Sequence, residues 1–363
     1  MLIGVDARSL LQKEVRGEGK TLLRLYQELA RLRPDWRVRL YGEAPPRSQP
    51  LAGAFAVRTW EIPGHRWNTW ERVALPLMAA RDRVDLLHCS SSTAPPFVGR
   101  PFVVTVHDII PLLFDDGQSV AHSRRFERSL RSALRRADAV IAASASTRRD
   151  LVGYFGIGPE RIEVIHWGAE TVAAPSKRGA PESDGLLVLA FGGDAPRKNT
   201  SGLLAAFAIA CKQAPAARLM MVGLSRAVKR AEFEALASRL GIADRVSFGG
   251  FVNDADLDRL YQRASVLFYP SLYEGFGMPI LEAMSHGLPV VASNVTSIPE
   301  VVGEAGVLVD PRDEQGMGEA LGRVLADPAL RASLRARGLD RAGSLSWEKC
   351  ARKTAEVFER VLA

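Results

Sequence analysis

The chain carries at residues 266–284 the stretch VLFYPSLYEGFGMPILEAM. Its first four residues form a short apolar run, typical of a buried parallel strand, and Pro279 presets the first turn of a helix. Residues 274–277 are therefore interpreted as a loop between a strand and a helix. In an open parallel sheet such a loop faces the ligand-binding crevice. The stretch predicts an α/β fold with a binding site at this loop.

Similar apolar runs, separated by helical segments, recur along the chain. They lie at residues 2–5, 38–41, 86–88, 102–106, 139–142, 186–191, 219–222, 246–248, 290–292 and 307–309. This alternation is typical of parallel sheets that helices cover on both faces. Small, polar and proline-containing residues interrupt it once, at 169–184. We predict two doubly wound domains, 1–170 and 171–345, and a terminal helix at 346–363 that packs back on the N-terminal domain.

Length and composition agree with two soluble domains. The 363 residues exceed the length at which one hydrophobic core keeps growing. Hydrophobic residues make up 47% of the chain and charged residues 25%, as in ordinary globular proteins. No charged-then-apolar leader and no metal-ligand spacing of cysteine or histidine is evident in the sequence. We expect a cytoplasmic protein without a structural metal.

Basic residues outnumber acidic residues by 48 to 41, a formal charge of +7. Such an excess suits an anionic ligand, an anionic membrane face or nucleic acid. In the basic segment 122–137, arginines alternate with Phe126, Leu130 and Leu134 at helical spacing. Packing of this helix on the sheet explains the pattern, and contact with the inner face of a membrane is the alternative. Aromatic and basic residues do not alternate on exposed strands, so no nucleic-acid partner is expected.

The loop after residues 266–269 has groups that suit a sugar. Gly275 and Gly277 let main chain approach a ligand, and N–H groups at a helix start can donate to hydroxyls or phosphates. Glu274 and Glu282 offer acceptor oxygens for a polyol. The simpler interpretation is that the glycines only shape a turn and Glu282 only interacts with the helix dipole.

A second candidate site, FGGDAPRKN, lies at residues 191–199, between a predicted strand and a predicted helix. Arg197 and Lys198 would add fixed positive charge to the N–H groups of the helix start, in a loop that contains Gly193. We interpret this loop as a clamp for a diphosphate. The alternative is a basic pair that is merely solvated.

Two other motifs are weaker. The sequence Gly19-Lys20-Thr21 matches the last three residues of a phosphate-binding P-loop motif. That motif also requires a glycine at the position of Glu14, so the match fails. Asp-x-Asp motifs at residues 254–258 resemble a metal site, yet they open a predicted helix, where acids cap and complement the helix start.

Taken together, the motifs resemble those of the family-4 glycosyltransferases, which have the GT-B fold. Glu274 and Glu282, separated by seven residues and followed by GLPVVAS at 287–293, match the family signature. Other segments follow in the family's order along nearly the whole chain. They are DAR at 6–8, GEGK at 17–20, HD at 107–108, VIHWG at 164–168, RKN at 197–199, FGGF at 248–251, IPE at 298–300 and LSW at 345–347.

The resemblance implies two Rossmann-like domains facing across a cleft, with the donor on the C-terminal domain. It implies that Glu282 binds the ribose of the nucleotide. Glu274, with the amides of Phe276 and Gly277, would bind the donor sugar, while Arg197 and Lys198 would bind the diphosphate. The N-terminal domain would contribute a segment that contains Gly17, Gly19 and Lys20, and this segment would contact the phosphate and the acceptor.

His107 follows the predicted strand at 102–106, so it stands at the carboxyl end of that strand. The resemblance implies that it meets the donor sugar or the acceptor, and a histidine satisfied in the core is the alternative. The residues expected to carry catalysis are therefore His107, Glu274, Arg197 and Lys198.

The resemblance also implies a retaining transfer from a nucleotide diphosphate sugar, with GDP-mannose favoured and a UDP-sugar as the alternative. The acceptor would be a sugar, a lipid-linked sugar or another hydroxyl compound in bacterial polysaccharide or glycoconjugate assembly. No metal or other cofactor is expected, because positioning and charge stabilisation supply the catalysis. Glu18, Lys20 and Trp167 depart from the family pattern and leave the acceptor open. A GT-B nucleotide-sugar epimerase and a basic nucleic-acid-binding protein are the alternative functions.

Overall fold

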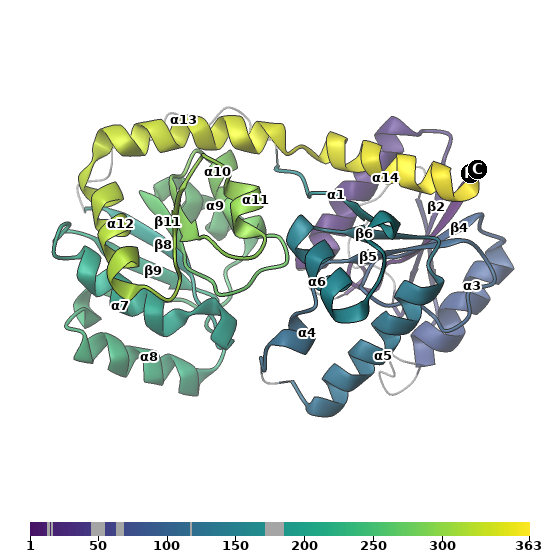
Figure 1. Cartoon of the computed structure of the whole chain (residues 1–363), viewed down its shortest axis with the longest axis horizontal. Coiled ribbons are helices and arrows are strands. Elements are labelled where there is room, and N and C mark those ends of the chain that lie inside the picture. The colour runs from purple at the N-terminus through teal and green to yellow at the C-terminus, as the bar shows by residue number, and fades with distance from the viewer. Residues whose placement is uncertain (13–14, 16, 45–54, 63–68, 117, 171–184) are drawn as a thin grey trace. The chain divides into compact units, whose positions relative to one another are not determined.

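The structure, a computed structural model, describes residues 1–12, 15, 17–44, 55–62, 69–116, 118–170 and 185–363. The chain forms two compact units (Figure 1). Unit 1 consists of Met1–Leu112, Gln118–Gly168 and Ser346–Ala363, and unit 2 consists of Leu113–Gly117 and Ala169–Leu345. Residues 171–184 of the predicted linker lie outside the described residues.

In the described part of the chain, unit 1 has a seven-stranded parallel sheet in the order β3-β2-β1-β4-β5-β6-β7. Its strands are β1 (Leu2–Asp6), β2 (Arg37–Gly42), β3 (Phe55–Thr59), β4 (Leu86–Cys89), β5 (Phe102–Val106), β6 (Ala139–Ala142) and β7 (Ile162–Val164). The predicted strands of this half are confirmed, but β3 and β7 were not predicted. Both are edge strands, and β3 has no buried residue, so a continuous apolar run is not required there.

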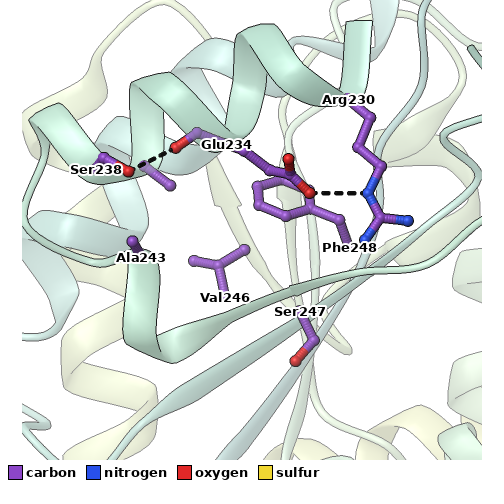
Figure 2. Close-up of a pocket in the computed structure, with 8 residues that line it drawn as sticks. Arg230, Glu234, Ser238, Ala243, Val246, Ser247 and Phe248 are labelled. Atoms are coloured by element: carbon purple, nitrogen blue, oxygen red, sulfur yellow. Dashed lines mark hydrogen bonds and ion pairs between the residues drawn. The ribbon is translucent and has the colours of Figure 1, made fainter. Parts of the chain in front are cut away.

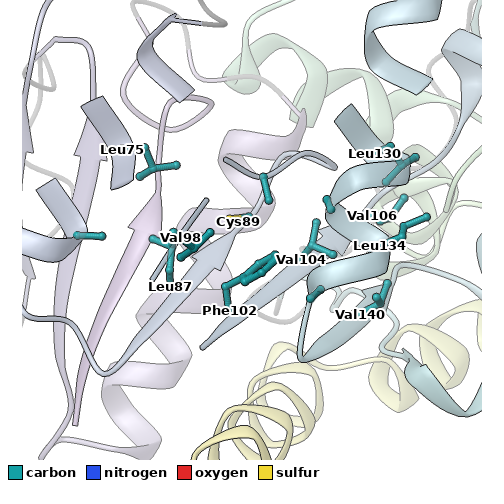
Figure 3. Close-up of a cluster of buried hydrophobic side chains, with 14 of the residues drawn as sticks. Leu75, Leu87, Cys89, Val98, Phe102, Val104, Val106, Leu130, Leu134 and Val140 are labelled. Atoms are coloured by element: carbon teal, nitrogen blue, oxygen red, sulfur yellow. The ribbon is translucent and has the colours of Figure 1, made fainter. Parts of the chain in front are cut away.

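The helices in the described residues of unit 1 pack around this sheet (Figure 1). They are α1 (Gly17–Leu32), η1 (Trp70–Ala74), α3 (Leu75–Asp82), α4 (Ile110–Leu113), α5 (Val120–Arg136), α6 (Ala145–Phe155), η2 (Pro159–Arg161) and α14 (Trp347–Leu362). Figure 3 shows Leu75 of α3 and Leu130 and Leu134 of α5 in one apolar core with strand residues. The basic segment 122–137 is thus an amphipathic helix whose apolar side packs on the sheet.

The terminal helix α14 belongs to unit 1 and packs against α1. Ser346 caps its start, as its side chain accepts a hydrogen bond from the Lys349 N–H at 3.2 Å. The buried Phe358 ring stacks on Trp36 with ring centroids 6.4 Å apart. An apolar stripe, rather than helix propensity alone, therefore holds the end of the chain in unit 1.

Unit 2 has, within its described residues, a six-stranded parallel sheet in the order β10-β9-β8-β11-β12-β13. Its strands are β8 (Leu187–Phe191), β9 (Arg218–Val222), β10 (Val246–Phe248), β11 (Val266–Tyr269), β12 (Val290–Ser293) and β13 (Val307–Val309). Its helices are η3 (Pro196–Lys198), α7 (Thr200–Ala210), α8 (Ala227–Arg239), η4 (Ala243–Arg245), α9 (Asp254–Arg263), α10 (Met278–Ser285), α11 (Ile298–Val302), α12 (Glu314–Ala326) and α13 (Pro328–Ser344). The predicted α/β class and the doubly wound sheets are confirmed.

The strand order determines where unit 2 can bind a ligand. From β8 the chain winds outward through β9 to β10, then returns to β11 on the other side of β8. The loops after β8 and β11 therefore leave the same edge of the sheet side by side, at the point where the winding reverses. Open α/β sheets bind their ligands at such a switch point.

The acids at the start of α9 do not form a metal site in the structure. Asn253 caps the helix by accepting a hydrogen bond from the Asp256 N–H at 2.9 Å, and Asp254 and Asp256 lie in the first turn. Across the described residues, no group of three or more His, Cys, Asp and Glu side chains is placed to hold a metal ion. Helices in the same part of the chain are all too short or too polar to cross a bilayer.

Candidate functional site

The loops after β8 and β11 are joined to each other by hydrogen bonds of unit 2. Asn199 has a left-handed backbone, with φ at 53°, and its side-chain amide donates to the Pro270 carbonyl at 3.1 Å. The Leu272 N–H donates to the Arg197 carbonyl at 2.7 Å. These bonds hold the predicted diphosphate clamp against the loop that begins the glutamate motif.

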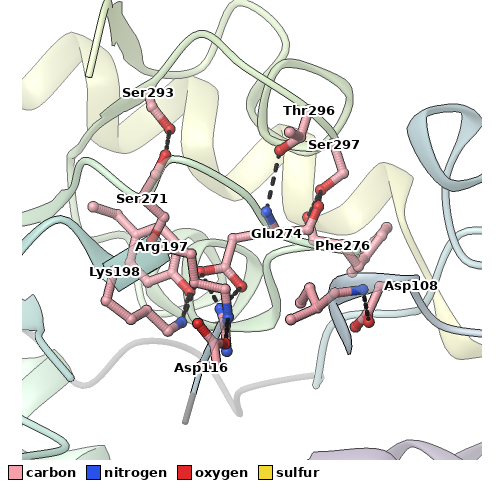
Figure 4. Close-up of polar contacts among 12 residues, drawn as sticks. Asp108, Asp116, Arg197, Lys198, Ser271, Glu274, Phe276, Ser293, Thr296 and Ser297 are labelled. Atoms are coloured by element: carbon pink, nitrogen blue, oxygen red, sulfur yellow. Dashed lines mark hydrogen bonds and ion pairs between the residues drawn. The ribbon is translucent and has the colours of Figure 1, made fainter. Parts of the chain in front are cut away.

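Arg197, Lys198 and Glu274 meet in one charged cluster (Figure 4). The Lys198 Nζ donates to Glu274 Oε1 at 2.7 Å and to the Tyr269 hydroxyl at 3.1 Å. The Arg197 Nη1 lies 3.4 Å from both carboxylate oxygens of Glu274. Two motifs that are 76 residues apart in sequence are thus brought together by the adjacency of β8 and β11.

The charges of this cluster stabilise one another. Burial on its own would raise the pKa of Glu274, but Lys198 and Arg197 outweigh it and hold that pKa below its usual value. For Arg197, burial opposes the charge, while Glu274 and Asp116 outweigh burial and raise the pKa of the guanidinium. Glu274 is therefore an ionised acceptor although only 8% of it is exposed.

Asp116 is a member of the charged cluster that the sequence did not indicate. Its Oδ2 accepts a hydrogen bond from Arg197 Nε at 2.8 Å, and its side chain is 10% exposed. The Phe114 ring, two residues earlier, packs against Tyr273 with centroids 5.5 Å apart. No motif surrounds Asp116, and it lies 81 residues before Arg197, so only the folded chain reveals the pair.

The loop at 274–277 has a fixed shape. The Ser297 hydroxyl lies within hydrogen-bond distance of the carbonyls of Glu274 and Phe276, at 2.8 and 2.9 Å, and the Glu274 N–H donates to Thr296 Oγ1 at 3.2 Å. Gly277 has φ at 107°, a conformation that side chains disfavour, and stands directly before α10. Thr296 and Ser297, which follow β12, thus hold the predicted sugar-binding loop in place.

Glu282 on α10 has a separate support. Its Oε2 accepts a hydrogen bond from the Tyr261 hydroxyl at 2.8 Å, and Tyr261 is 2% exposed. Burial, followed by the charge of Glu282, raises the pKa of Tyr261, so the tyrosine remains a donor. The Phe191 ring packs on both Tyr261 and Tyr269, which connects the surroundings of Glu282 to those of Lys198.

Gly193 lies against Lys198, since a Cβ at this glycine would stand 3.0 Å from the lysine Cγ. The Gly193 N–H donates to Thr200 Oγ1 at 3.2 Å. A larger residue at this position would push on the lysine stem. Gly193 therefore contributes to the charged cluster through its small size.

The remaining predicted site residues belong to unit 1. Gly17, Gly19 and Lys20 form the first turn of α1. A Cβ at Gly19 would lie 2.3 Å from the Ser9 carbonyl oxygen, whereas nothing lies within 4 Å of one at Gly17. Gly19 thus lets α1 approach the loop after β1 closely, whereas a Cβ at position 17 would meet no neighbouring atoms.

His107 stands directly after β5 and has a defined orientation. Its Nε2 lies 2.8 Å from the Ser90 carbonyl oxygen, which can only accept, so Nε2 carries the hydrogen. Its ring packs against the buried Trp167 with centroids 5.5 Å apart, and Trp167 in turn stacks on Trp347. The Nδ1 of a neutral His107 is then an acceptor.

A pocket of about 390 Å³ lies elsewhere in unit 2, between α8, η4 and β10 (Figure 2). Arg230 and Glu234 form an ion pair beside it, and Val246 and Phe248 contribute apolar surface. The described residues that line this pocket include no residue of the predicted site. The pocket is distinct from the charged cluster.

Comparison with known proteins establishes the family. Residues 15–172 match the family model "Glycosyltransferase Family 4", and residues 174–341 match "Glycosyl transferases group 1". O-antigen chain mannosyltransferase B of Escherichia coli is 32% identical over 291 residues, which cover 77% of this chain and 76% of that protein. The chain belongs to glycosyltransferase family 4. It is a glycosyltransferase enzyme, and the predicted family and fold are confirmed.

This family-4 glycosyltransferase also resembles longer proteins and solved structures. Serotype-specific mannosyltransferase WbdA of Escherichia coli is 31% identical over 276 residues, 72% of this chain but only 33% of that protein. The structure of Anabaena Alr3699/HepE in complex with UDP-glucose superimposes with a TM-score of 0.76 at 21% identity, covering 99% of both chains. At that identity the structural likeness shows the GT-B fold alone. Neither the epimerase nor the nucleic-acid alternative receives support from these similarities.

Proposed function

We propose that this family-4 glycosyltransferase moves a sugar, with mannose favoured, from a nucleoside diphosphate to a hydroxyl acceptor in bacterial polysaccharide or glycoconjugate assembly. The observation that carries the proposal is the meeting of Arg197, Lys198 and Glu274 at the switch point of unit 2. Two cations beside an ionised acceptor suit a phosphate next to a sugar hydroxyl.

In this proposal, described residues of unit 2 bind three groups of the donor. Arg197 and Lys198 bind the diphosphate, and Glu274 with the amides of Phe276 and Gly277 binds the sugar. Glu282, held by Tyr261, binds the ribose. Mannose is favoured because two similar proteins are mannosyltransferases by name. GDP is favoured over UDP as its carrier on the family resemblance of the motifs. A structural neighbour holds UDP-glucose, which keeps a UDP-sugar as the alternative.

Catalysis in this proposal is positioning and charge stabilisation without a metal ion. As the bond from sugar to phosphate breaks, Arg197 and Lys198 stabilise the charge that develops on the departing diphosphate. The acceptor hydroxyl attacks from the same face, and the leaving phosphate oxygen takes its proton, so the anomeric configuration is retained. Glu274 orients the sugar through its hydroxyls.

The acceptor side of the proposal rests on unit 1. A neutral His107 accepts a hydrogen bond from a sugar hydroxyl through Nδ1, because Nε2 donates to Ser90. Gly17, Gly19 and Lys20 would contribute to the phosphate and the acceptor from the start of α1. Glu18 and Trp167, which depart from the family pattern, would select the acceptor.

We place the reaction in the cytoplasm, at the inner face of the membrane when the acceptor is a lipid-linked sugar. The free thiols of Cys89, Cys211 and Cys350 support a reducing compartment. Exposed arginines of α5, such as Arg124 and Arg128, support contact with anionic lipid. Sedimentation with vesicles containing anionic lipid tests that contact, and loss of binding in the Arg124→Glu, Arg128→Glu double variant is expected.

A donor array tests the function. The enzyme is incubated with GDP-mannose and UDP-sugars, with and without a panel of hydroxyl acceptors, and release of nucleoside diphosphate is measured. Release that requires an acceptor is expected, and NMR of the product should show the anomeric configuration of the donor. Interconversion of the donor alone would indicate an epimerase. Failure of every nucleotide sugar to bind would refute the donor site.

A further inference from the structure

The charged cluster is electrically balanced within the described residues of unit 2. Its two cations, Arg197 and Lys198, contact two carboxylates, Asp116 and Glu274, at distances of 2.7 to 3.4 Å. A balanced cluster attracts an anion less than bare cations do. A diphosphate can exploit both cations fully only when one carboxylate gives way.

The two carboxylates are not equally well held. Glu274 pairs with both cations, and its loop is tied down by Thr296 and Ser297. Asp116 contacts Arg197 through Oδ2, whereas its Oδ1 is buried without a hydrogen-bond partner among the described residues. A buried acceptor without a partner costs free energy. Asp116 is therefore the carboxylate that leaves more easily.

Arg197 also has the right chemistry for an exchange of ligands. Its planar guanidinium matches carboxylate and phosphate oxygens with the same fork of N–H groups. The Nε that now donates to Asp116 can donate to a phosphate oxygen instead. Asp116 belongs to a short segment of unit 2, Leu113–Gly117, whose neighbours on both sides in the chain belong to unit 1.

We propose that Asp116 is the counter-ion of Arg197 in the free enzyme and that the donor diphosphate displaces it. This inference rests on the proposed donor site and adds a residue that determines its affinity. Asp116 competes with phosphate for Arg197, so it weakens the binding of nucleoside diphosphates. The same ion pair gives the partly buried Arg197 a partner while the site is empty.

Calorimetric titration of the full-length enzyme with GDP and with UDP tests the proposal. Asp116→Asn removes the competing charge at nearly constant shape, and we expect the preferred nucleotide to bind about tenfold more tightly. Asp115→Asn is the matched control, because it removes the same charge from an exposed neighbour, and its affinity should stay near that of the unaltered enzyme. Unchanged or weaker binding by Asp116→Asn would overturn the proposal.

Two further variants separate the possible failures. Asp116→Ser repeats the test without an amide, should the asparagine variant fold poorly, and the same gain in affinity is expected. Arg197→Ala should weaken nucleotide binding, and adding Asp116→Asn to it should bring no gain, because the competition acts through Arg197. If Arg197→Ala binds as the unaltered enzyme does, the proposed donor site is wrong. If it binds weakly while Asp116→Asn shows no gain, only the counter-ion proposal fails.

Discussion

At the level of single residues, the neighbours of Lys198 determine how well its charge can stabilise a leaving phosphate. Its side chain is 18% exposed, and its ammonium group lies between the carboxylate of Glu274 and the hydroxyl of Tyr269. A fixed cation at this point needs no rearrangement when a phosphate leaves, and such preorganised charge is worth more in a partly buried site than in water.

Lys198→Met keeps the apolar stem of the side chain and removes the charge. We expect kcat for sugar transfer to fall by about a hundredfold or more, the usual effect of removing one preorganised donor. Steady-state kinetics with the preferred donor measure it. Lys229→Met on α8, which removes an exposed lysine paired with Glu232, should leave kcat unchanged. Equal rates in the two variants would remove Lys198 from the mechanism.

The hydroxyl of Tyr261 should matter to a ligand that it does not touch. It orients Glu282, so Tyr261→Phe should weaken nucleotide binding by about 0.5–1.5 kcal/mol, and Glu282→Ala by about 1.5–3 kcal/mol. Titration with the preferred nucleoside diphosphate measures both. Tyr154→Phe, at a tyrosine that is 42% exposed in unit 1, is the matched control. Full affinity in Glu282→Ala would show that Glu282 does not bind the ribose.

At the scale of elements, α14 is held by its buried side chains rather than by its ion pairs. Phe358 is fully buried and packs on His88, with centroids 5.3 Å apart, as well as on Trp36. The ion pair between Glu359 and Arg33 has side chains that are 46% and 34% exposed, so solvent screens it.

This difference predicts unequal effects of two neighbouring substitutions. Phe358→Ala should lower the free energy of unfolding of unit 1 by about 3–5 kcal/mol, whereas Glu359→Ala should cost less than about 1 kcal/mol. All six tryptophans lie within the sequence ranges of unit 1, so tryptophan fluorescence during urea unfolding follows that unit. Similar losses in the two variants would contradict the packing argument.

At the scale of the whole molecule, one buried histidine should make stability depend on pH. His88 is 1% exposed, with Nδ1 and Nε2 each 2.8 Å from a hydroxyl, that of Tyr26 and that of Thr105. Burial, with a smaller effect of His107, lowers the pKa of His88 from 6.5 to about 3. The unfolded chain therefore binds a proton that the folded chain excludes between these two values.

Stability from this group is complete above pH 6.5 and is lost as the pH falls towards 3. The free energy of unfolding should fall by up to about 1.4 kcal/mol for each pH unit in that window. Urea unfolding followed by tryptophan fluorescence at several pH values between 6.5 and 4.5 measures the slope. His88→Gln, which cannot titrate, should show a shallower slope, and an equal slope would refute the assignment to His88.

Several elements and part of the candidate site were predictable because their signals are local. A central parallel strand must be apolar on both faces, so β8 and β11 appear in the sequence as short apolar runs. An edge strand need not be apolar on both faces, and for that reason the sequence did not predict the edge strands β3 and β7. The loops after β8 and β11 were recognised because glycine, proline and charged residues cluster there within a few positions.

Local patterns in the sequence were enough to predict the family, the α/β class and the two motifs that we assign to the donor. Apolar periodicity and motif spacing are properties of neighbouring residues, and they need no coordinates. The folded chain was needed to show that Asp116 pairs with Arg197, that Tyr261 holds Glu282, and that His88 is buried and neutral. Electrostatic and hydrogen-bond energies depend on distances of a few ångströms between residues far apart in the chain, and folding alone sets those distances.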